Sequence, residues 1–209
     1  MEIKRFILGD FETNCFVLRR NTSCSECLII DAGLDPRKLI EFLQKEKLHI
    51  DTVVLTHGHA DHIAGLHFLR QFQNDLKVCI HSLDTEMLNC PQSNLSLITG
   101  FSFTTRADCT LNDGQLIEQA GIELKIIHTP GHTPGGICLY SQKDEILFSG
   151  DSLFADSVGR TDFPGGDMAK LTKSIKEKIL TLPEETLVYP GHGPMTTIGK
   201  EKKTNPFLQ

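Results

Sequence analysis

The chain has 209 residues and a mass of 23.3 kDa, which allows one large hydrophobic core and lies in the size range of single α/β domains. It has 39% hydrophobic and 23% charged residues and no Pro/Ser/Gly-rich linker, which excludes a disordered or fibrous chain. A formal net charge of −6 and a pI near 5.8 argue against a nucleic-acid partner, because proteins that follow a phosphate backbone usually carry a basic surface. We therefore expect a single domain over residues 1–209.

The sequence also bears on location and on the state of its thiols. No apolar run approaches the ~18 residues that span a bilayer, and the N-terminal stretch MEIKRFILGDFETN lacks the apolar core of a signal peptide. We expect a cytoplasmic protein without a membrane partner. Its seven cysteines are then expected to be reduced and mostly buried. Cys24 and Cys27 form a lone C-x-x-C, which has no second pair with which to build a zinc ribbon.

The first half of the chain alternates predicted strands and helices. Apolar runs closed by polar or glycine residues predict strands at 14–20, 26–33, 51–57 and 77–81. A helix is predicted over 35–48, because Asp35 can act as its N-cap and Pro36 suits the first helical position. Apolar residues that recur every third position from Ile63 to Phe72 predict a second helix. The polar stretch 89–106 predicts a surface loop.

The second half repeats this pattern. Strands are predicted at 121–131, 136–140, 145–151 and 186–193. The first of these alternates apolar and polar residues as a half-buried strand does, and the polar SQKD between the next two suits a hairpin. A helix is predicted over 167–180, with Asp167 near its start and lysines toward its end, as the helix dipole favours.

Four predicted strands end in histidine or aspartate, in the stretches VVLTHGH, IIHTPGH, ILFSGD and LVYPGH. If these strands lie side by side in two sheets, their ends converge on one rim. Packing cannot satisfy all four polar side chains within the six residues HGHADH, whereas metal ions use them all. The predicted ligands are His57, His59, Asp61, His62, His132, Asp151 and His192. The remaining histidines are interpreted as ordinary core or surface residues: His49, His67, His81 and His128.

Seven ligands are too many for one tetrahedral zinc ion, which takes about four, so the set predicts two metal ions. His57 and His59 can face one ion, while Asp61 and His62, a short turn later, face its neighbour. Imidazole suits several divalent transition metals, and a carboxylate can bridge two of them. We expect two divalent ions, zinc in the first place, with iron or manganese as alternatives.

These motifs resemble a known family. THGHADHIAG, TPGHTPGG, SGDSLF and YPGHG are similar to the five ordered metal motifs of the metallo-β-lactamase superfamily, and the resemblance runs from ETNCFVL to TNPF. It implies an α/β fold, a four-layered αββα sandwich with the site at one rim of its two sheets. It also implies the distribution of ligands: His57, His59 and His132 on the first metal, Asp61, His62 and His192 on the second, and Asp151 bridging. Asp61 and Asp151 are the carboxylates expected to act in catalysis.

Within this superfamily the chain is most similar to short bacterial members of the glyoxalase II group, which hydrolyse hydroxyacyl-glutathione thioesters. The stretches GRTDFPGGD and GKEKKTNPF carry this similarity. It implies that Arg160 holds the glutathione part of the substrate. Two departures are present: the C-terminal helical extension of the longer enzymes is absent, and Pro194 stands two residues after His192, where those enzymes have tyrosine. The implied partner is a small-molecule thioester, such as a glutathione conjugate.

The chemistry of the residues points the same way. Two neighbouring metal ions can lower the pKa of a shared water from about 15.7 toward about 7 and can polarise a carbonyl, which predicts a hydrolase. A thiolate, whose thiol has a pKa of about 8.5, leaves without much help from a general acid. A thioester is therefore favoured over an amide as the substrate.

Three other functions are alternatives to this one. A β-lactamase is disfavoured, because those enzymes are usually exported and many have cysteine where this chain has Asp151. A persulfide dioxygenase is the main alternative, because those enzymes are similar through HADH and GRTDF but use one iron held by two histidines and a carboxylate. A non-catalytic metal-binding member of the fold is disfavoured, because all seven ligand positions are filled. The sequence indicates no oligomer interface.

Overall fold

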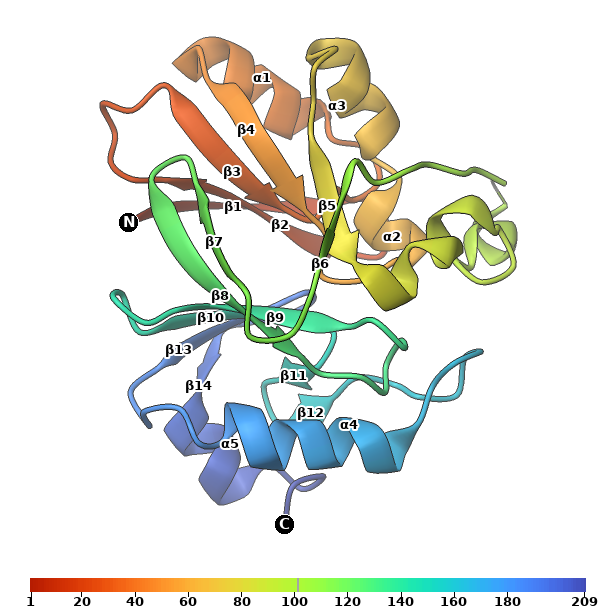
Figure 1. Ribbon diagram of the computed structural model, residues 1–209, viewed down its shortest axis with the longest axis vertical. Coiled ribbons are helices and arrows are strands. Elements are labelled where there is room, and N and C mark those ends of the chain that lie inside the picture. Colours follow the sequence, from red (N-terminus) through yellow and green to blue (C-terminus); the bar gives the residue numbers. More distant parts are fainter. Residues whose placement is uncertain (101) are drawn as a thin grey trace.

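The computed structural model describes residues 1–100 and 102–209, which form two six-stranded mixed sheets packed face to face (Figure 1). The first sheet has strands in chain order: β1 (Glu2–Leu8), β2 (Thr13–Arg19), β3 (Glu26–Ile30), β4 (His49–Val54), β5 (Val78–His81) and β6 (Cys109–Leu111). The second sheet has the order β14 (Thr196–Thr197), β13 (Leu187–Pro190), β10 (Ile146–Gly150), β9 (Ile137–Ser141), β8 (Ile122–His128) and β7 (Leu116–Gln119). A small hairpin follows β10, formed by β11 (Leu153–Phe154) and β12 (Ser157–Val158).

Helices cover the outer face of each sheet (Figure 1). The first sheet carries α1 (Arg37–Glu46) and α3 (Leu66–Phe72), with the short α2 (Ala60–Ile63) at its edge. The second sheet carries α4 (Met168–Ser174) and α5 (Ile198–Thr204). The predicted four-layered αββα sandwich is therefore confirmed. Within the described part of the chain, no helix combines the length and the apolar character needed to cross a bilayer.

Alternating side chains along the strands build three apolar layers. In β2, Phe16 packs between the two sheets, whereas its neighbour Val17 packs toward α1 and α3. In β8, Ile126 lies between the sheets, whereas Ile127 packs toward α4. All four side chains are buried. Because both faces of each sheet are covered, the strands read as apolar runs, and their polar residues are displaced to the strand ends.

Two predicted helices differ from the observed ones. The helix predicted over 35–48 begins at Arg37, and Asp35 is not its cap, because Asp35 has a φ of 53° and binds the Arg37 side chain instead. The helix predicted from Ile63 to Phe72 is divided into α2 and α3. Gly65 lies between them at a position that only glycine fits, since a Cβ atom there would collide with the carbonyl oxygen of Gly33. The close approach of these two glycines fixes α2 against the end of β3.

The other predicted elements lie close to those observed. The helix over 167–180 begins after Asp167, whose side chain accepts a hydrogen bond from the Lys170 amide, and it continues past α4 as a π-helical turn (Ile175–Ile179). After Asn89, which ends a 3-10 turn, the described residues of the predicted loop at 89–106 contain only a short 3-10 helix (Ser96–Thr99), and residue 101 lies outside the described residues. Two further 3-10 turns precede it, Ser82–Asp84 and Glu86–Asn89. The sequence did not predict β1, β6, β7, β14 or α5, which are short or half exposed.

One pair of cysteines is not reduced as the sequence predicts. Cys79 in β5 and Cys109 in β6 form a disulfide, with Cα atoms 4.7 Å apart, so the prediction of reduced thiols is wrong for this pair. Cys24 and Cys27 are free thiols, and Cys27 is buried. The C-x-x-C motif therefore forms no disulfide in this fold.

Candidate metal centre

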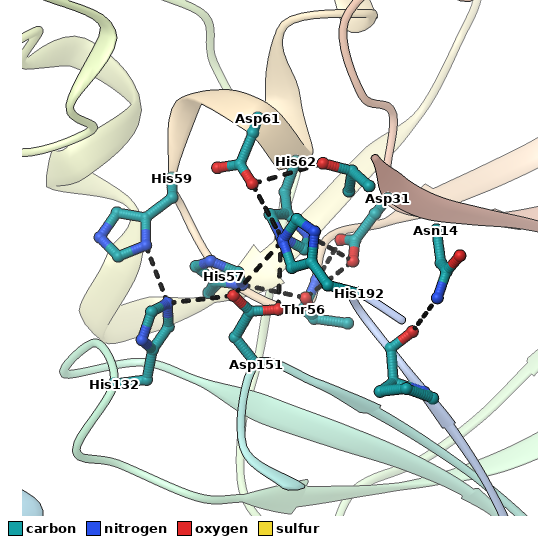
Figure 2. Close-up of polar contacts among 12 residues, drawn as sticks. Asn14, Asp31, Thr56, His57, His59, Asp61, His62, His132, Asp151 and His192 are labelled. Carbon is teal, nitrogen blue, oxygen red and sulfur yellow. Dashed lines mark hydrogen bonds and ion pairs between the residues drawn. The ribbon is translucent and has the colours of Figure 1, made fainter. Parts of the chain in front are cut away.

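Loops at the carboxyl ends of strands from both sheets bring the predicted ligands to one rim of the sandwich (Figure 2). The segment after β4 and the short helix α2 carry the first four, the turn after β8 carries the fifth, and the residues after β10 and β13 carry the last two. In chain order they are His57, His59, Asp61, His62, His132, Asp151 and His192. Their ligand atoms form overlapping groups of three, within each of which all atoms lie within 4.8 Å of one another.

The first cluster consists of His57, His59 and His132. The three rings lie edge to face, with centroids 4.7 to 4.8 Å apart. His59 Nδ1 lies 2.9 Å from His132 Nε2, and none of the three residues is more than 4% exposed. The cluster offers three nitrogen ligands in a buried place, the number that a catalytic zinc site usually takes from the protein.

The second cluster consists of Asp61, His62 and His192. Asp61 Oδ2 lies 3.1 Å from His192 Nε2 and 3.4 Å from His62 Nε2, and the two nitrogens are 3.2 Å apart. Thr13 donates a hydrogen bond from its hydroxyl to the same aspartate oxygen. This cluster is more open to solvent, because the side chains of Asp61 and His192 are 20% and 27% exposed.

Asp151 reaches both clusters from the end of β10. Its Oδ2 lies 3.5 Å from His132 Nε2, in the first cluster, and its Oδ1 lies 3.4 Å from His62 Nε2, in the second. Figure 2 shows the carboxylate between the two groups of rings. Gly191 makes room for this arrangement, since a Cβ atom at that position would collide with the Asp151 carboxylate and the His62 ring. The geometry suits a carboxylate that touches two neighbouring cations.

Asp31 supports the second cluster from behind. Its carboxylate accepts hydrogen bonds from the amide and the hydroxyl of Thr56 and from Nδ1 of His62, all at 2.8 Å. Because a carboxylate only accepts, the proton of His62 is held at Nδ1, and Nε2 faces the cluster. Such an outer carboxylate orients a metal-binding imidazole and increases its basicity.

Asp84 joins the two loops that carry the first cluster. Its buried carboxylate accepts hydrogen bonds from the Gly58 amide at 3.2 Å and from the Thr133 hydroxyl at 2.7 Å, and it also accepts one from the Gly135 amide. Gly58 lies between His57 and His59, and Thr133 follows His132. Burial raises the pKa of Asp84. This one side chain therefore positions ligands contributed by both sheets.

Three buried polar atoms at the centre have no hydrogen-bond partner among the described residues, namely His57 Nε2, His59 Nε2 and Asp151 Oδ1. Buried polar groups are nearly always satisfied, and binding of cations would satisfy groups of this kind. Five imidazoles and two carboxylates also form a donor set that suits zinc, iron or manganese. The residues present therefore fit bound divalent metal ions.

The two clusters differ in their electrostatics. Burial and the neighbouring imidazoles lower the pKa of His57 far below its usual range and lower that of His59 to about 3. Burial also opposes protonation of His62, but the carboxylates of Asp61 and Asp31 outweigh it and raise the pKa of His62 to about 10. In the first cluster, His57 and His59 are thus held as neutral imidazoles, whereas the second cluster is a network of charged pairs.

Arg160 lies beside the first cluster. Its backbone carbonyl accepts a hydrogen bond from His132 Nδ1 at 2.7 Å, and its guanidinium lies over the Phe163 ring. Its side chain is paired with Asp162 at the surface. The backbone carbonyl of Phe11 holds Nδ1 of His192 in the same way, at 2.9 Å.

Comparison with known proteins agrees with this architecture. The family model described as the metallo-beta-lactamase superfamily matches residues 8–192, a span that includes all seven clustered residues. The chain belongs to the metallo-beta-lactamase superfamily. Its similarity to proteins of this superfamily extends over the whole chain, and metal-dependent hydrolases are among them.

Two relatives illustrate the similarity in sequence. The chain is 35% identical to a protein of Bacillus subtilis named probable metallo-hydrolase YqgX, over 100% of this chain and 98% of the relative. It is 32% identical to hydroxyacylglutathione hydrolase GloC of Haemophilus influenzae, again over 100% of this chain and 98% of the relative.

Three solved structures have the same fold. The BLEG-1 B3 metallo-beta-lactamase superposes with a TM-score of 0.93 at 40% identity and full coverage of both chains. TTHA1623 in a di-iron-bound form has a TM-score of 0.86 at 35% identity, covering 98% of this chain and 100% of that one. ETHE1 from Myxococcus xanthus has a TM-score of 0.80 at 26% identity, covering 99% of this chain and 84% of that one.

The structure also contains site residues that sequence reasoning missed. Asp31 directly follows the apolar run ECLII, so it carries the same strand-end signal as the predicted ligands. Thr56 likewise follows the apolar run VVL, whereas Asp84 has no such position. His128, which ends β8, stacks on His81 with centroids 4.1 Å apart, and neither residue belongs to the clusters.

Proposed function

We propose that this superfamily member is a dinuclear metal-dependent hydrolase that cleaves a thioester of the hydroxyacyl-glutathione type. The observation that carries this proposal is the position of Asp151, whose carboxylate lies within 3.6 Å of His132 Nε2 in the first cluster and of His62 Nε2 and His192 Nε2 in the second. A single metal ion would leave one of these clusters without a cation. The similarity to hydroxyacylglutathione hydrolase GloC of Haemophilus influenzae supports the thioester as substrate.

The proposed ligands follow the two clusters. One ion would be held by the first cluster, the other by the second, and Asp151 would contact both. When bound, the ions would lower the pKa of a water toward about 7 and would polarise the carbonyl of the substrate. The reaction consumes one water: oxygen adds to the carbonyl carbon, the C–S bond breaks, and a hydroxy acid and a thiol are released.

The chain's own side chains prepare this reaction by holding protons away from the centre. Asp31 keeps the proton of His62 at Nδ1, and backbone carbonyls do the same for His132 and His192. In each of these rings Nε2 is left to face the centre. Because their orientation is fixed in advance, the ligand atoms need little reorganisation when the site is filled.

The open side of the centre is where substrate would enter. Asp61 and His192 are partly exposed, whereas the histidines of the first cluster are buried, so the carbonyl would approach over the second cluster and Asp151. We propose that Arg160, beside the first cluster, contacts a carboxylate of the thiol part. The departing thiolate needs little help from a general acid, since thiols have a pKa of about 8.5.

A persulfide dioxygenase is the second candidate, and the similarity to ETHE1 from Myxococcus xanthus favours it. Such an enzyme would use one iron, held by two histidines and a carboxylate. The two candidates differ in a simple way, because the dioxygenase consumes oxygen and the hydrolase does not.

The experiment that tests the proposal is a substrate panel with metal-replete protein purified without chelator. We expect cleavage of S-lactoylglutathione under anaerobic conditions, and cleavage of other acyl thioesters. A β-lactam belongs in the panel, because one similar structure is described as a B3 metallo-beta-lactamase. Oxygen uptake with glutathione persulfide, without cleavage of any thioester, would replace the hydrolase with the dioxygenase.

A further inference from the structure

The segment beside the first cluster carries an arginine that already holds a carboxylate. The hydrogen bond from His132 Nδ1 to the Arg160 carbonyl ties this segment to the candidate metal centre. The Arg160 guanidinium carbon lies 4.0 Å from the centroid of the Phe163 ring, and that ring makes an edge contact with His59, with centroids 5.9 Å apart. The cation therefore lies next to the first cluster and is not a remote surface charge.

Asp162 occupies one of the two edges of the Arg160 guanidinium at which a carboxylate can bind through two parallel bonds. Its Oδ1 accepts a hydrogen bond from Arg160 Nε, and its Oδ2 accepts one from Nη2, both at 2.7 Å. Arginine recognises carboxylates best through such a pair of parallel bonds. These bonds also lower the pKa of Asp162 to about 2, so its carboxylate is ionised throughout the physiological range.

The position of Asp162 allows it to compete with a substrate carboxylate for the Arg160 guanidinium, and it can still be displaced. It stands two residues from Arg160, so it competes as an intramolecular group, which for short connections corresponds to an effective concentration of about millimolar or higher. The two side chains are 59% and 64% exposed, and solvent screening keeps such pairs weak. The pair also cancels the positive charge that would attract an anionic substrate to this side of the centre.

We propose that Asp162 is a specificity-determining residue that disfavours thioesters with an anionic thiol part, such as glutathione, relative to hydroxyacyl thioesters of neutral thiols. This inference rests on the proposed thioesterase function. A glutathione carboxylate must displace Asp162 to bind at the Nε–Nη2 edge of Arg160, and at the other edge it meets a guanidinium whose charge Asp162 already offsets. A neutral thiol part has no carboxylate that needs the guanidinium, so it avoids the competition.

The test is Asp162→Asn, assayed on two lactoyl thioesters that differ only in the thiol. Asparagine keeps the size of the side chain and one acceptor oxygen but removes the charge. We expect the KM for S-lactoylglutathione to fall about two- to five-fold, the range that the loss of an exposed ion pair allows. The KM for S-lactoyl-N-acetylcysteamine and both kcat values should stay at the wild-type level.

Two further variants locate the effect. Asp156→Asn is the matched control, since Asp156 is a 58% exposed aspartate paired with Lys200 at 2.7 Å, on the β11–β12 hairpin. It should change neither KM. The double variant Arg160→Ala, Asp162→Asn should lose the gain on S-lactoylglutathione, because the gain requires the freed guanidinium.

If Asp162 only supported its loop, Asp162→Asn would change the KM for both substrates equally. That result would overturn the inference. So would a gain that persists when Arg160 is alanine. Binding of S-methylglutathione, a thioether that cannot be hydrolysed, separates this inference from the proposed function. Its Kd should fall about two- to five-fold in Asp162→Asn even if no thioester is cleaved, and an unchanged Kd would contradict the role of Asp162 by itself.

Discussion

The two clusters of the candidate centre contain similar side chains but differ in how the fold supports them. In the first cluster, three buried imidazoles face one another, and the carboxylate that positions them, Asp84, acts through the backbone and a hydroxyl. In the second, carboxylates touch the imidazoles directly: Asp31 binds Nδ1 of His62, and Asp61 lies against Nε2 of His192. The conformation of two loops therefore positions the side chains of the first cluster, whereas ion pairs position those of the second. Variants of the supporting carboxylates should separate these two modes.

Asp151→Asn should have the largest effect, because it acts on both clusters at once. Asparagine keeps the shape but removes the negative charge that would offset two cations. We expect a folded protein that loses most of its metal at one or both clusters and at least ~10²-fold in kcat. Elemental analysis and thioester kinetics would measure this.

The control for Asp151→Asn is His128→Asn. His128 stacks on His81 and hydrogen-bonds the Pro134 carbonyl, away from both clusters. Metal content and rate should stay near the wild-type values. If both variants kept their metal and their activity, the ligand assignment would be wrong.

Asp31→Asn should affect the second cluster alone. The asparagine Nδ2 would donate where the carboxylate accepts, which would move the proton of His62 from Nδ1 to Nε2 and block the atom that faces the cluster. We expect the affinity for one of two metal ions to fall about 10- to 100-fold. Asn is well suited to the backbone here, since Asp31 has a φ of 58°.

Chelator competition should then show one weak and one wild-type site in Asp31→Asn. Circular dichroism would verify that the fold is unchanged. An equal loss of affinity for both metal ions would mean that Asp31 supports the whole rim and not the second cluster alone.

Asp84→Asn should have a smaller effect, confined to the first cluster. One carboxylate oxygen accepts from the Gly58 amide and the Thr133 hydroxyl, and the other accepts from the Gly135 amide, so asparagine can keep only one of these two sets. We expect a loss of about 1–3 kcal/mol in the free energy of unfolding, as for buried groups left unsatisfied. Denaturant titration of the metal-free protein would measure it.

The affinity for one metal ion should fall about 10-fold in the same variant, at the low end of what outer carboxylates contribute. The outcome that contradicts this role is a metal affinity equal to that of wild type in a variant that is clearly destabilised. Asp84 would then support the fold without positioning ligands.

Arg160→Ala should change substrate recognition only. Because Asp162 already pairs with the guanidinium, we expect the KM for S-lactoylglutathione to rise by no more than about two- to five-fold. Metal content and the activity on a neutral thioester should be unchanged. Equal losses on both substrates would assign Arg160 to the support of its loop.

The ligand candidates could be predicted from the sequence because each one lies within HGHADH or follows an apolar run after a short segment that ends in glycine. Asp31 carries the same strand-end signal but stands alone, without a second polar residue to draw attention to it. Asp84 could not be found in this way, since its partners lie 26 to 51 residues away and meet it only in the folded chain. The pairing of Arg160 with Asp162 is local in sequence, but the direction of a flexible exposed side chain depends on its neighbours, here Phe163.

Most elements of the fold were predictable for the same reason that the site was. Strands buried on both faces are nearly continuous apolar runs, so their positions are visible in the sequence. The edge strand β1 was missed because four of its seven residues are charged or exposed, and α5 because charged residues dominate it. The error at Asp35 has a specific cause, since its side chain turns to Arg37 and the helix begins without a side-chain cap.

The most direct test of the central claim is the number of transition-metal ions bound per chain in protein purified without chelator. Two clusters linked by Asp151 predict close to two ions, loss of thioesterase activity after strong chelation, and its recovery when metal is restored. Elemental analysis alongside the thioester assay gives both quantities. A reproducible content of one ion per chain, in protein with full activity, would contradict the dinuclear centre.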